Sequence, residues 1–324
     1  YPGEWIADFP MLEQDYHTWS DHMMLRSEKG SRAELCEEFA KAVRNTNADE
    51  VNEDAFSRLS ELWEQYLMDA SGKGLVFNQP GRLLRPDNLR ASPVLRLFPL
   101  PVAKRNGKLG DKMSERFEEY KKKVIKPFYE DYFAKIDRQI VLVDILRTLQ
   151  LGEEAFNELI DALRSVLKAF RYGRSNKLWN WLTGHNTTHL LFAVTKADHV
   201  VRGDRANLRN FFKAVVRLID EDNQLKSSVD QWEILDIAAV QATEDRMTVK
   251  APKREVLYGK PYSAEKPGAW DPGGVPLDVP PDWENLGFEF FEFDPGLMPQ
   301  ALTEGFPAIH LGKALDFLIG EDLI

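Results

Sequence analysis

Four residues at the end of an apolar run have the types and spacing of a loop that reads a purine base. Residues 190–194 are all apolar, and Thr195, Lys196, Ala197 and Asp198 follow them directly. A carboxylate in the plane of guanine accepts hydrogen bonds from N1–H and the 2-amino group together. Adenine has neither donor, so it would leave a buried carboxylate unpaired at a cost of about 1–3 kcal/mol. We therefore expect Asp198 to read guanine, the methylene stem of Lys196 to lie along the base, and Thr195 to tie the loop.

This spacing matches the [N/T]-K-x-D pattern by which Ras-like GTPases hold guanine. The pattern arises by chance in roughly one chain of this length in ten, and a polar turn with Asp198 as a helix N-cap is the alternative. A second small-residue turn, Gln241-Ala242-Thr243, follows the next apolar run. Its position predicts that the backbone N–H of Ala242 approaches the guanine oxygen.

The start of the chain contains a third candidate. Residues 1–4 read Tyr-Pro-Gly-Glu and resemble the end of a D-x-x-G switch motif, in which the glycine N–H contacts the γ-phosphate and the aspartate reaches Mg²⁺. Gly3 would be that glycine, and Glu4 would occupy the position of a water-orienting residue. A carboxylate there places negative charge beside the phosphate, so slow or partner-assisted hydrolysis is expected. An ordinary turn is the alternative interpretation.

The alternation of elements around these motifs predicts how they are positioned. Apolar runs at 139–146, 190–194 and 234–240 have the length of buried strands, and helical patterns at 153–171 and 205–221 separate them. Strand–helix alternation of this kind is typical of βαβ units and a parallel sheet covered on both faces. Since ligands bind at the carboxyl ends of such strands, the two loops should lie at one edge of the sheet. Asp144 ends the first run at the same rim, where we expect a structural role.

The remaining segments predict a helical part and two irregular parts. Residues 11–135 have mostly helical periodicity, with a Pro/Gly-rich segment at 73–110 that includes a candidate edge strand at 94–101. Residues 244–300 carry many prolines and glycines and are expected to form a long irregular excursion, with a short strand near 287–295. A final helix within 310–323 is expected to pack on the sheet.

Composition limits the class of protein. The chain has 324 residues, is 43% hydrophobic and 29% charged, and carries a net charge of −10, which argues against nucleic acid as its main partner. Its single cysteine, Cys36, suits a reducing compartment. Since the sequence contains no apolar stretch of 18 residues, no transmembrane segment is expected, and we predict a cytoplasmic protein.

Several segments together resemble the YcjX-like family of bacterial P-loop NTPases, described as stress proteins. They span the chain from end to end, and they read YPGEW, FNQPGRLLRPDNL, IDRQIVLVDIL, TKADHV, VQATED and FPAIHLGKALDFLIGEDLI. The resemblance implies a Ras-like nucleotide-binding domain from residues 1–10 and 136–324, elaborated by a helical insert at 11–135. About 190 residues separate Gly3 from Thr195, whereas a compact domain needs roughly 50–60 there.

The resemblance also implies what this chain lacks. The family's Walker A loop, G-x-x-x-x-G-K-[ST], is absent from the sequence, and so are the first strands of the Ras-like sheet. We therefore expect the C-terminal part of a longer protein, inactive by itself, whose parent hydrolyses GTP with Mg²⁺ held by upstream residues; no metal ligand is assigned in this chain. The positions carried over as nucleotide contacts are Gly3, Thr195, Lys196, Asp198 and Ala242, with Glu4 as the catalytic candidate.

Two other functions remain open at this point. Family descriptions favour ATP hydrolysis, against the guanine preference that Asp198 predicts. A non-catalytic interaction scaffold, with the helical part as its working surface, belongs to a different class. The resemblance also implies a stress-related role near the inner membrane, beside a membrane-associated protein partner.

Overall fold

The computed structural model describes residues 2–49, 53–90, 92–175, 188–220, 225, 229–284, 286–296 and 305–320. The chain divides into two compact units. The first, called the helical unit below, comprises Tyr1–Ile136 and Asn157–His185. The second, called the sheet unit, comprises Asp137–Phe156 and Asn186–Ile324. Each unit is described by itself.

This division differs from the one expected from the sequence, which grouped residues 1–10 and 157–185 with the sheet. Phe9 is fully buried and lies 4.8 Å, centroid to centroid, from the ring of Phe133 in the helical unit. Glu158 is buried and pairs with Arg32 at 2.7 Å. Apolar burial of Phe9 and the buried ion pair of Glu158 thus tie these two residues to the helices.

The sheet unit is built on a parallel sheet with the order β1-β2-β3. Its strands are β1 (Arg138–Val143), β2 (His189–Val194) and β3 (Gln231–Asp236). The register places Leu142 beside Ala193 and Ala193 beside Leu235. The predicted parallel arrangement is confirmed, although β3 begins three residues earlier than expected. β2 is buried along its whole length, as its uninterrupted apolar sequence requires for a central parallel strand.

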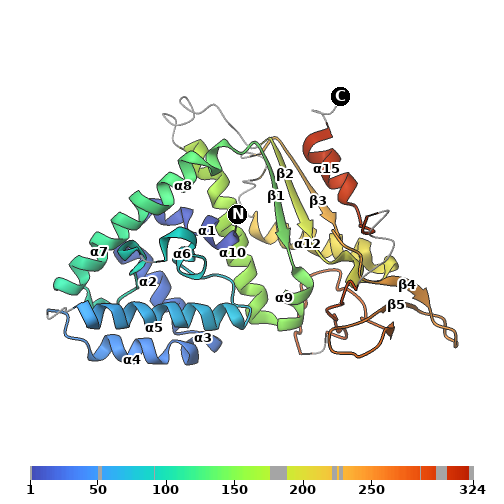
Figure 1. Ribbon diagram of the computed structural model, residues 1–324, viewed down its shortest axis with the longest axis horizontal. Helices are drawn as coiled ribbons and strands as arrows, with labels where there is room; N and C mark the ends of the chain where they lie inside the picture. Colours follow the sequence, from blue (N-terminus) through green and yellow to red (C-terminus); the bar gives the residue numbers. More distant parts are fainter. Residues whose placement is uncertain are drawn as a thin grey trace. The chain divides into compact units, whose positions relative to one another are not determined.

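Helices cover the two faces of this sheet (Figure 1). Phe192 of β2 contacts Phe212 of α12 (Arg205–Ile219), with ring centroids 6.0 Å apart. Alternate residues of β2 and β3 face the other way and cluster with Ala314 of α15 (Leu311–Ile319). The predicted final helix on the sheet is therefore confirmed. β1 is followed by α9 (Ile145–Leu151) and then by α10 (Glu153–Ser175). Only the first turn of α10 belongs to the sheet unit.

Most of the described residues within 244–300 are irregular, as expected, but this region also contains a small second sheet that was not predicted. Its antiparallel strands, in the order β4-β5-β6, are β4 (Glu244–Met247), β5 (Glu255–Gly259) and β6 (Gly268–Trp270). β4 is polar and largely exposed, so it lacks the apolar alternation that would mark it in the sequence. The strand expected near 287–295 is present as isolated bridges, one of which joins Phe293 to Pro261.

The helical unit packs amphipathic helices around aromatic side chains. Its longer helices are α2 (Tyr16–Ser27), α4 (Glu37–Asn45), α5 (Glu53–Gly72), α7 (Lys108–Tyr120) and most of α10. Its short helical elements are α1 (Gly3–Ile6), η1 (Phe9–Glu13), α3 (Gly30–Leu35), α6 (Gly81–Leu84), η2 (Asp87–Leu89), η3 (Pro93–Leu95), η4 (Val102–Lys104), η5 (Lys121–Ile125), α8 (Lys126–Asp131) and η6 (Phe133–Lys135). α5 buries Phe56, Leu59, Trp63, Tyr66 and Leu67 on one side, the face that 3.6-residue spacing predicts.

The predicted edge strand at 94–101 is wrong. Leu97, Phe98 and Leu100 are fully buried, but none of them lies in a strand. The Leu97 N–H donates to the Leu95 carbonyl at 2.8 Å, and side chains bind the backbone of Phe98 and Leu100. Ser20 Oγ donates to the Leu100 carbonyl at 2.9 Å and accepts from the Leu100 N–H at 2.8 Å. The Tyr16 hydroxyl donates to the Phe98 carbonyl at 3.1 Å. A buried extended segment needs these bonds in place of a ladder.

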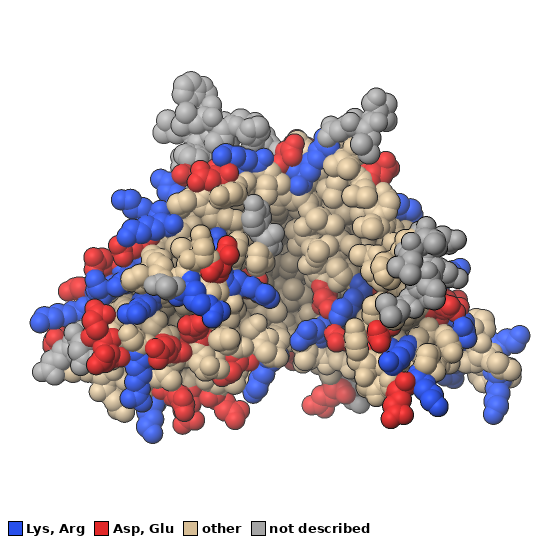
Figure 2. Space-filling model, viewed as in Figure 1, with Lys and Arg blue, Asp and Glu red and all other residues tan. Residues whose placement is uncertain are grey.

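The surface charge of the helical unit is mixed in sign on the face that Figure 2 shows. Lysines of the η5 turn illustrate the pattern, since Lys121 pairs with Glu118 and Lys123 pairs with Glu119 at 2.9 and 2.6 Å. Such exposed pairs contribute little to stability, and they leave this turn without a concentrated positive charge.

Within the described ranges, no helix has the length and hydrophobicity to cross a membrane.

Candidate functional site

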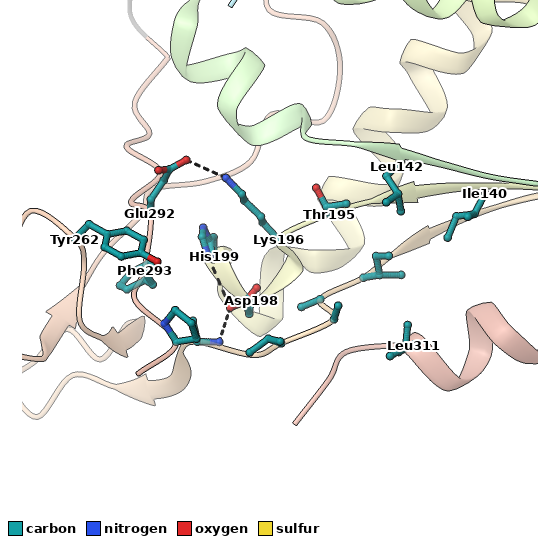
Figure 3. Close-up of a pocket in the computed structure, with 16 residues that line it drawn as sticks. Ile140, Leu142, Thr195, Lys196, Asp198, His199, Tyr262, Glu292, Phe293 and Leu311 are labelled. Carbon is teal, nitrogen blue, oxygen red and sulfur yellow. Dashed lines mark hydrogen bonds and ion pairs between the residues drawn. The ribbon is translucent and has the colours of Figure 1, made fainter. Parts of the chain in front are cut away.

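The candidate site is a cavity of about 630 Å³ at the carboxyl ends of the parallel strands (Figure 3). That volume is within the usual range for small-molecule pockets. Its lining includes Thr195, Lys196, Asp198 and Ala242, so the fold brings together the two loops singled out in the sequence. Ile140, Leu142 and Leu311 contribute an apolar end.

Thr195 ties its loop to the neighbouring strand. Its N–H donates to the Val143 carbonyl at the end of β1 at 3.0 Å, and its Oγ1 donates to the same oxygen at 3.3 Å. Ala197 then donates its N–H to the Ile237 carbonyl, which follows β3, at 3.0 Å. The loop is therefore held from both sides of the central strand.

Lys196 has an unusual backbone conformation. Its φ of 61° is left-handed, which costs about 1–2 kcal/mol for a residue with a side chain. This reversal turns the chain from β2 into the short helix η7 (Ala197–His199). Strain of this kind occurs at ligand-binding positions when the surrounding contacts enforce it.

Asp198 is the buried carboxylate of the cavity, with 2% of its surface exposed. Its Oδ2 accepts the backbone N–H of Ala242 at 2.8 Å, and its carbonyl oxygen accepts the hydroxyl of Thr243. An acceptor and a donor thus stand side by side in the cavity wall. Guanine presents the complementary pair, an N1–H donor beside the O6 acceptor. A base with this pattern could replace the Asp198–Ala242 hydrogen bond by its own bonds to the two groups.

His199 also faces this carboxylate, and sequence reasoning missed it. Its Nε2 lies 3.8 Å from Asp198 Oδ2, and its ring contacts Phe293 with centroids 5.3 Å apart. Burial lowers the pKa of His199, although the Asp198 carboxylate acts in the opposite direction. Burial thus disfavours a positive charge on the imidazole beside Asp198. No residue type or spacing in the T-K-x-D pattern points to this histidine.

The Lys196 ammonium lies between two carboxylates. Its Nζ is 2.9 Å from Asp144 Oδ2 and 3.0 Å from Glu292 Oε1. Burial alone would lower the pKa of Lys196, but the hydrogen bonds and charges of these partners raise it. The bond to Lys196 in turn lowers the pKa of Glu292. Both groups therefore carry their charges at neutral pH.

Of these two carboxylates, only Asp144 had drawn attention in the sequence. It caps α9 by accepting the Arg147 N–H at 3.1 Å, which agrees with the structural role expected for it, and it also pairs with Lys196. Glu292 is 96 residues away from Lys196 along the chain and lies in no recognisable motif. Only the fold could reveal this contact.

Gly3 and Glu4 belong to the helical unit, in α1, so their predicted roles at the phosphates stay predictions. A Cβ built on Gly3 would meet nothing within 4 Å, so local packing does not require a glycine there. The backbone of Glu4 lies close to Gly81, where an added Cβ would be 2.1 Å from the Glu4 carbonyl oxygen. In the part of the chain that the structure describes, no group of three or more His, Cys, Asp or Glu side chains could hold a metal ion.

Comparison with known proteins identifies similar chains. The model of the YcjX-like family, DUF463, matches residues 1–323. A protein of Escherichia coli (strain K12) named "Ras-like GTPase YcjX" is 35% identical over 345 residues, covering 100% of this chain and 71% of the relative. A protein of the same name from Shewanella oneidensis is 32% identical over 342 residues, covering 100% of this chain and 69% of the relative.

Proposed function

The chain belongs to the YcjX-like family, and from that premise and the geometry of the cavity we propose that it binds the guanine base of GTP and GDP. Two curated relatives carry the name of a Ras-like GTPase, which supports a nucleotide-binding protein of the GTPase type. The particular base is argued from this chain's own residues.

One observation carries the proposal: the buried Asp198 carboxylate and the Ala242 N–H lie 2.8 Å apart on one cavity wall. In this role Asp198 accepts from N1–H and the 2-amino group, and Ala242 donates to O6. Adenine would face the carboxylate with an acceptor at N1 and would leave it unpaired. Thr195 holds the loop, and the Lys196 stem lies along the base.

We further propose that the complete protein hydrolyses GTP. In that reaction the Gly3 N–H contacts the γ-phosphate and Glu4 orients the attacking water. When bound, Mg²⁺ would neutralise charge on the phosphates; the described residues provide no ligand cluster for it, and no ligand is assigned among them. Because Glu4 places a carboxylate beside the phosphate, hydrolysis should be slow. In single-turnover assays Glu4→Gln should therefore speed hydrolysis and Glu4→Ala should slow it; equal rates for all three proteins would remove Glu4 from the mechanism.

The base assignment is tested by displacement of fluorescent GDP from the complete protein with Mg²⁺ present. Unlabelled GDP should compete at least about tenfold better than ADP, because only guanine pairs with the buried carboxylate. Equal competition by ADP would support the ATP-hydrolysing alternative. Failure of both nucleotides to compete would support the non-catalytic scaffold.

The family resemblance extends the proposal to a stress-related role at the inner membrane. In this proposal a membrane-associated protein partner provides the attachment. Cell fractionation with and without candidate membrane partners tests this, and equal distribution in both cases would contradict it.

A further inference from the structure

Two short segments of the sheet unit run side by side along the cavity. The Tyr262 N–H donates to the Glu292 carbonyl at 2.9 Å, and the Asp294 N–H donates to the Lys260 carbonyl at 2.8 Å. Residues 260–262 and 292–294 therefore form a paired strip, joined also by the bridge between Pro261 and Phe293. Tyr262, Glu292 and Phe293 all line the cavity.

Phe293 anchors this paired strip to the interior. Only 4% of its surface is exposed, and it clusters with Val201 and Leu257. It also packs so tightly against Gly259 that a Cβ there would lie 2.9 Å from its ring. Because Phe293 also contacts His199 beside Asp198, the strip has a defined position relative to the predicted base-reading carboxylate.

Glu292 connects the paired strip to the predicted base-binding loop. Its carboxylate lies 3.0 Å from the Lys196 ammonium, and Figure 3 shows the Lys196 side chain extending toward it. A lysine side chain has several rotatable bonds and loses rotamer entropy when it is ordered. An ion pair at its tip, shared with Asp144, restrains the methylene stem before any ligand arrives.

Tyr262 presents an aromatic ring that the protein itself leaves largely uncovered. Its exposed fraction is 68% although it lines the cavity, and in Figure 3 it lies beside Glu292 and Phe293. Aromatic rings stack on bases with little dependence on base identity, because every base has a π-face. An exposed ring that lines the same cavity as a buried acceptor–donor pair therefore suits a planar heterocycle.

We propose that the paired strip forms a second wall of the base site, in which Tyr262 stacks on the base and Glu292 is a positioning residue for Lys196. The proposal rests on the proposed function, because it takes a nucleotide base as the occupant. It adds two contacts that neither the T-K-x-D motif nor the Gln-Ala-Thr turn contains.

The stacking role is tested by calorimetric titration of the complete protein with GDP. Tyr262→Ala should weaken GDP binding about tenfold, within the range for loss of one base–aromatic stack. Tyr262→Phe keeps the ring and should bind within about twofold of the unaltered protein. Equal affinity of the alanine variant, or an equal loss in both variants, would overturn the stacking role.

The positioning role is tested by Glu292→Gln, with Glu289→Gln as the matched control. Glu289 lies in the same segment but does not line the cavity. The Glu292 variant should weaken GDP binding about threefold to tenfold, and the loss should shrink in a Lys196→Ala background because both changes act on one side chain. Equal losses with and without Lys196, or an equal loss in the control, would overturn this role.

A third readout separates this proposal from the choice of base. Since stacking tolerates any base, Tyr262→Ala should weaken GDP and ADP by the same factor. If ADP binds the unaltered protein as well as GDP does, and both nucleotides lose affinity in Tyr262→Ala, the guanine preference is refuted. The stacking role of Tyr262 is then supported. If GDP is preferred but Tyr262→Ala changes nothing, the second wall fails and guanine reading stands; if neither nucleotide binds, both fail.

Discussion

Asp8 and Asp198 are both nearly fully buried carboxylates, but their surroundings suit them to different roles. Asp8 in the helical unit is 1% exposed and Asp198 in the sheet unit is 2% exposed. Each accepts a backbone N–H from a small residue, Gly81 at 2.9 Å in one case and Ala242 at 2.8 Å in the other. Burial and a backbone donor are therefore common to both.

The difference lies in what else surrounds the carboxylate. Asp8 also accepts the Tyr120 hydroxyl at 2.6 Å, and Tyr120 is itself fully buried, so protein groups enclose it. Burial raises the pKa of Asp8 to about 7, against the lowering by its hydrogen bonds from Tyr120 and Gly81. Asp198 instead lines a cavity. A buried carboxylate indicates a binding site only where a ligand can reach it; elsewhere it organises the fold.

The largest effect expected from this contrast is on stability. Asp8→Ala should lower the free energy of unfolding of the helical unit by about 2–4 kcal/mol, because the Gly81 N–H and the Tyr120 hydroxyl would lose a buried partner. Urea titration read by amide hydrogen exchange in α7 measures this unit separately. The GDP-to-ADP preference should not change. A loss of unfolding free energy below about 0.5 kcal/mol, or a changed GDP-to-ADP preference, would contradict the different roles of Asp8 and Asp198.

A somewhat smaller effect is expected at Gly81, whose N–H holds Asp8. Gly81→Ala would place a Cβ 2.1 Å from the Glu4 carbonyl oxygen, so the backbone must shift at a cost of about 1–3 kcal/mol. Gly72→Ala is the control, since a Cβ at the end of α5 meets nothing within 4 Å. It should be neutral or stabilise by up to about 1 kcal/mol. Equal unfolding midpoints for the two variants would contradict the packing argument.

The most gradual effect is a pH dependence, which is spread over several pH units. The pKa of Asp8 is raised from 3.8 to about 7, so between these values the folded state binds more protons than the unfolded state. Its contribution is fully present below pH 3.8 and is lost as pH rises through about 7. Stability of the helical unit should therefore fall from pH 5 to 7 with a slope of up to about 1.4 kcal/mol per pH unit.

Asp8→Asn provides the control for this slope, because it removes the titrating group and keeps an acceptor for Gly81. Glu158 does not interfere, since its pKa is lowered and it titrates below this window: burial would raise that pKa, but the bonds and charge of Arg32 outweigh it. If the asparagine variant retained the slope, another group would be responsible.

The sequence predicts the parts of the fold in which burial and periodicity agree. β2 is recognisable because a central parallel strand is apolar on both faces, and α5 because its apolar residues repeat at 3.6-residue spacing. The edge strand predicted at 94–101 is absent because an apolar extended run need not pair with a strand: Ser20 and Tyr16 bind the carbonyls of Leu100 and Phe98 instead. β4 was not predicted because an exposed strand with charged residues has no apolar pattern.

The residues of the candidate site also divide into those that the sequence pattern indicated and those that it did not. Thr195, Lys196, Asp198 and Ala242 were found because two loops following successive parallel strands must meet at one edge of the sheet. Tyr262 and Glu292 were not found, since their proximity to this edge depends on packing of segments remote in sequence, and His199 was not found because the T-K-x-D pattern ends at Asp198. Nothing in the types of these residues separates them from others in the sequence.

The most direct test of guanine reading exchanges the hydrogen-bonding character of residue 198. Asp198→Asn replaces an acceptor by a side chain that also donates, and xanthine carries an oxygen where guanine carries its 2-amino group. GDP and xanthosine diphosphate would each be titrated into the complete protein and the variant. The account predicts that the variant loses GDP affinity by about tenfold or more and prefers xanthosine diphosphate. Unchanged GDP affinity, with no gain for xanthosine diphosphate, would contradict it.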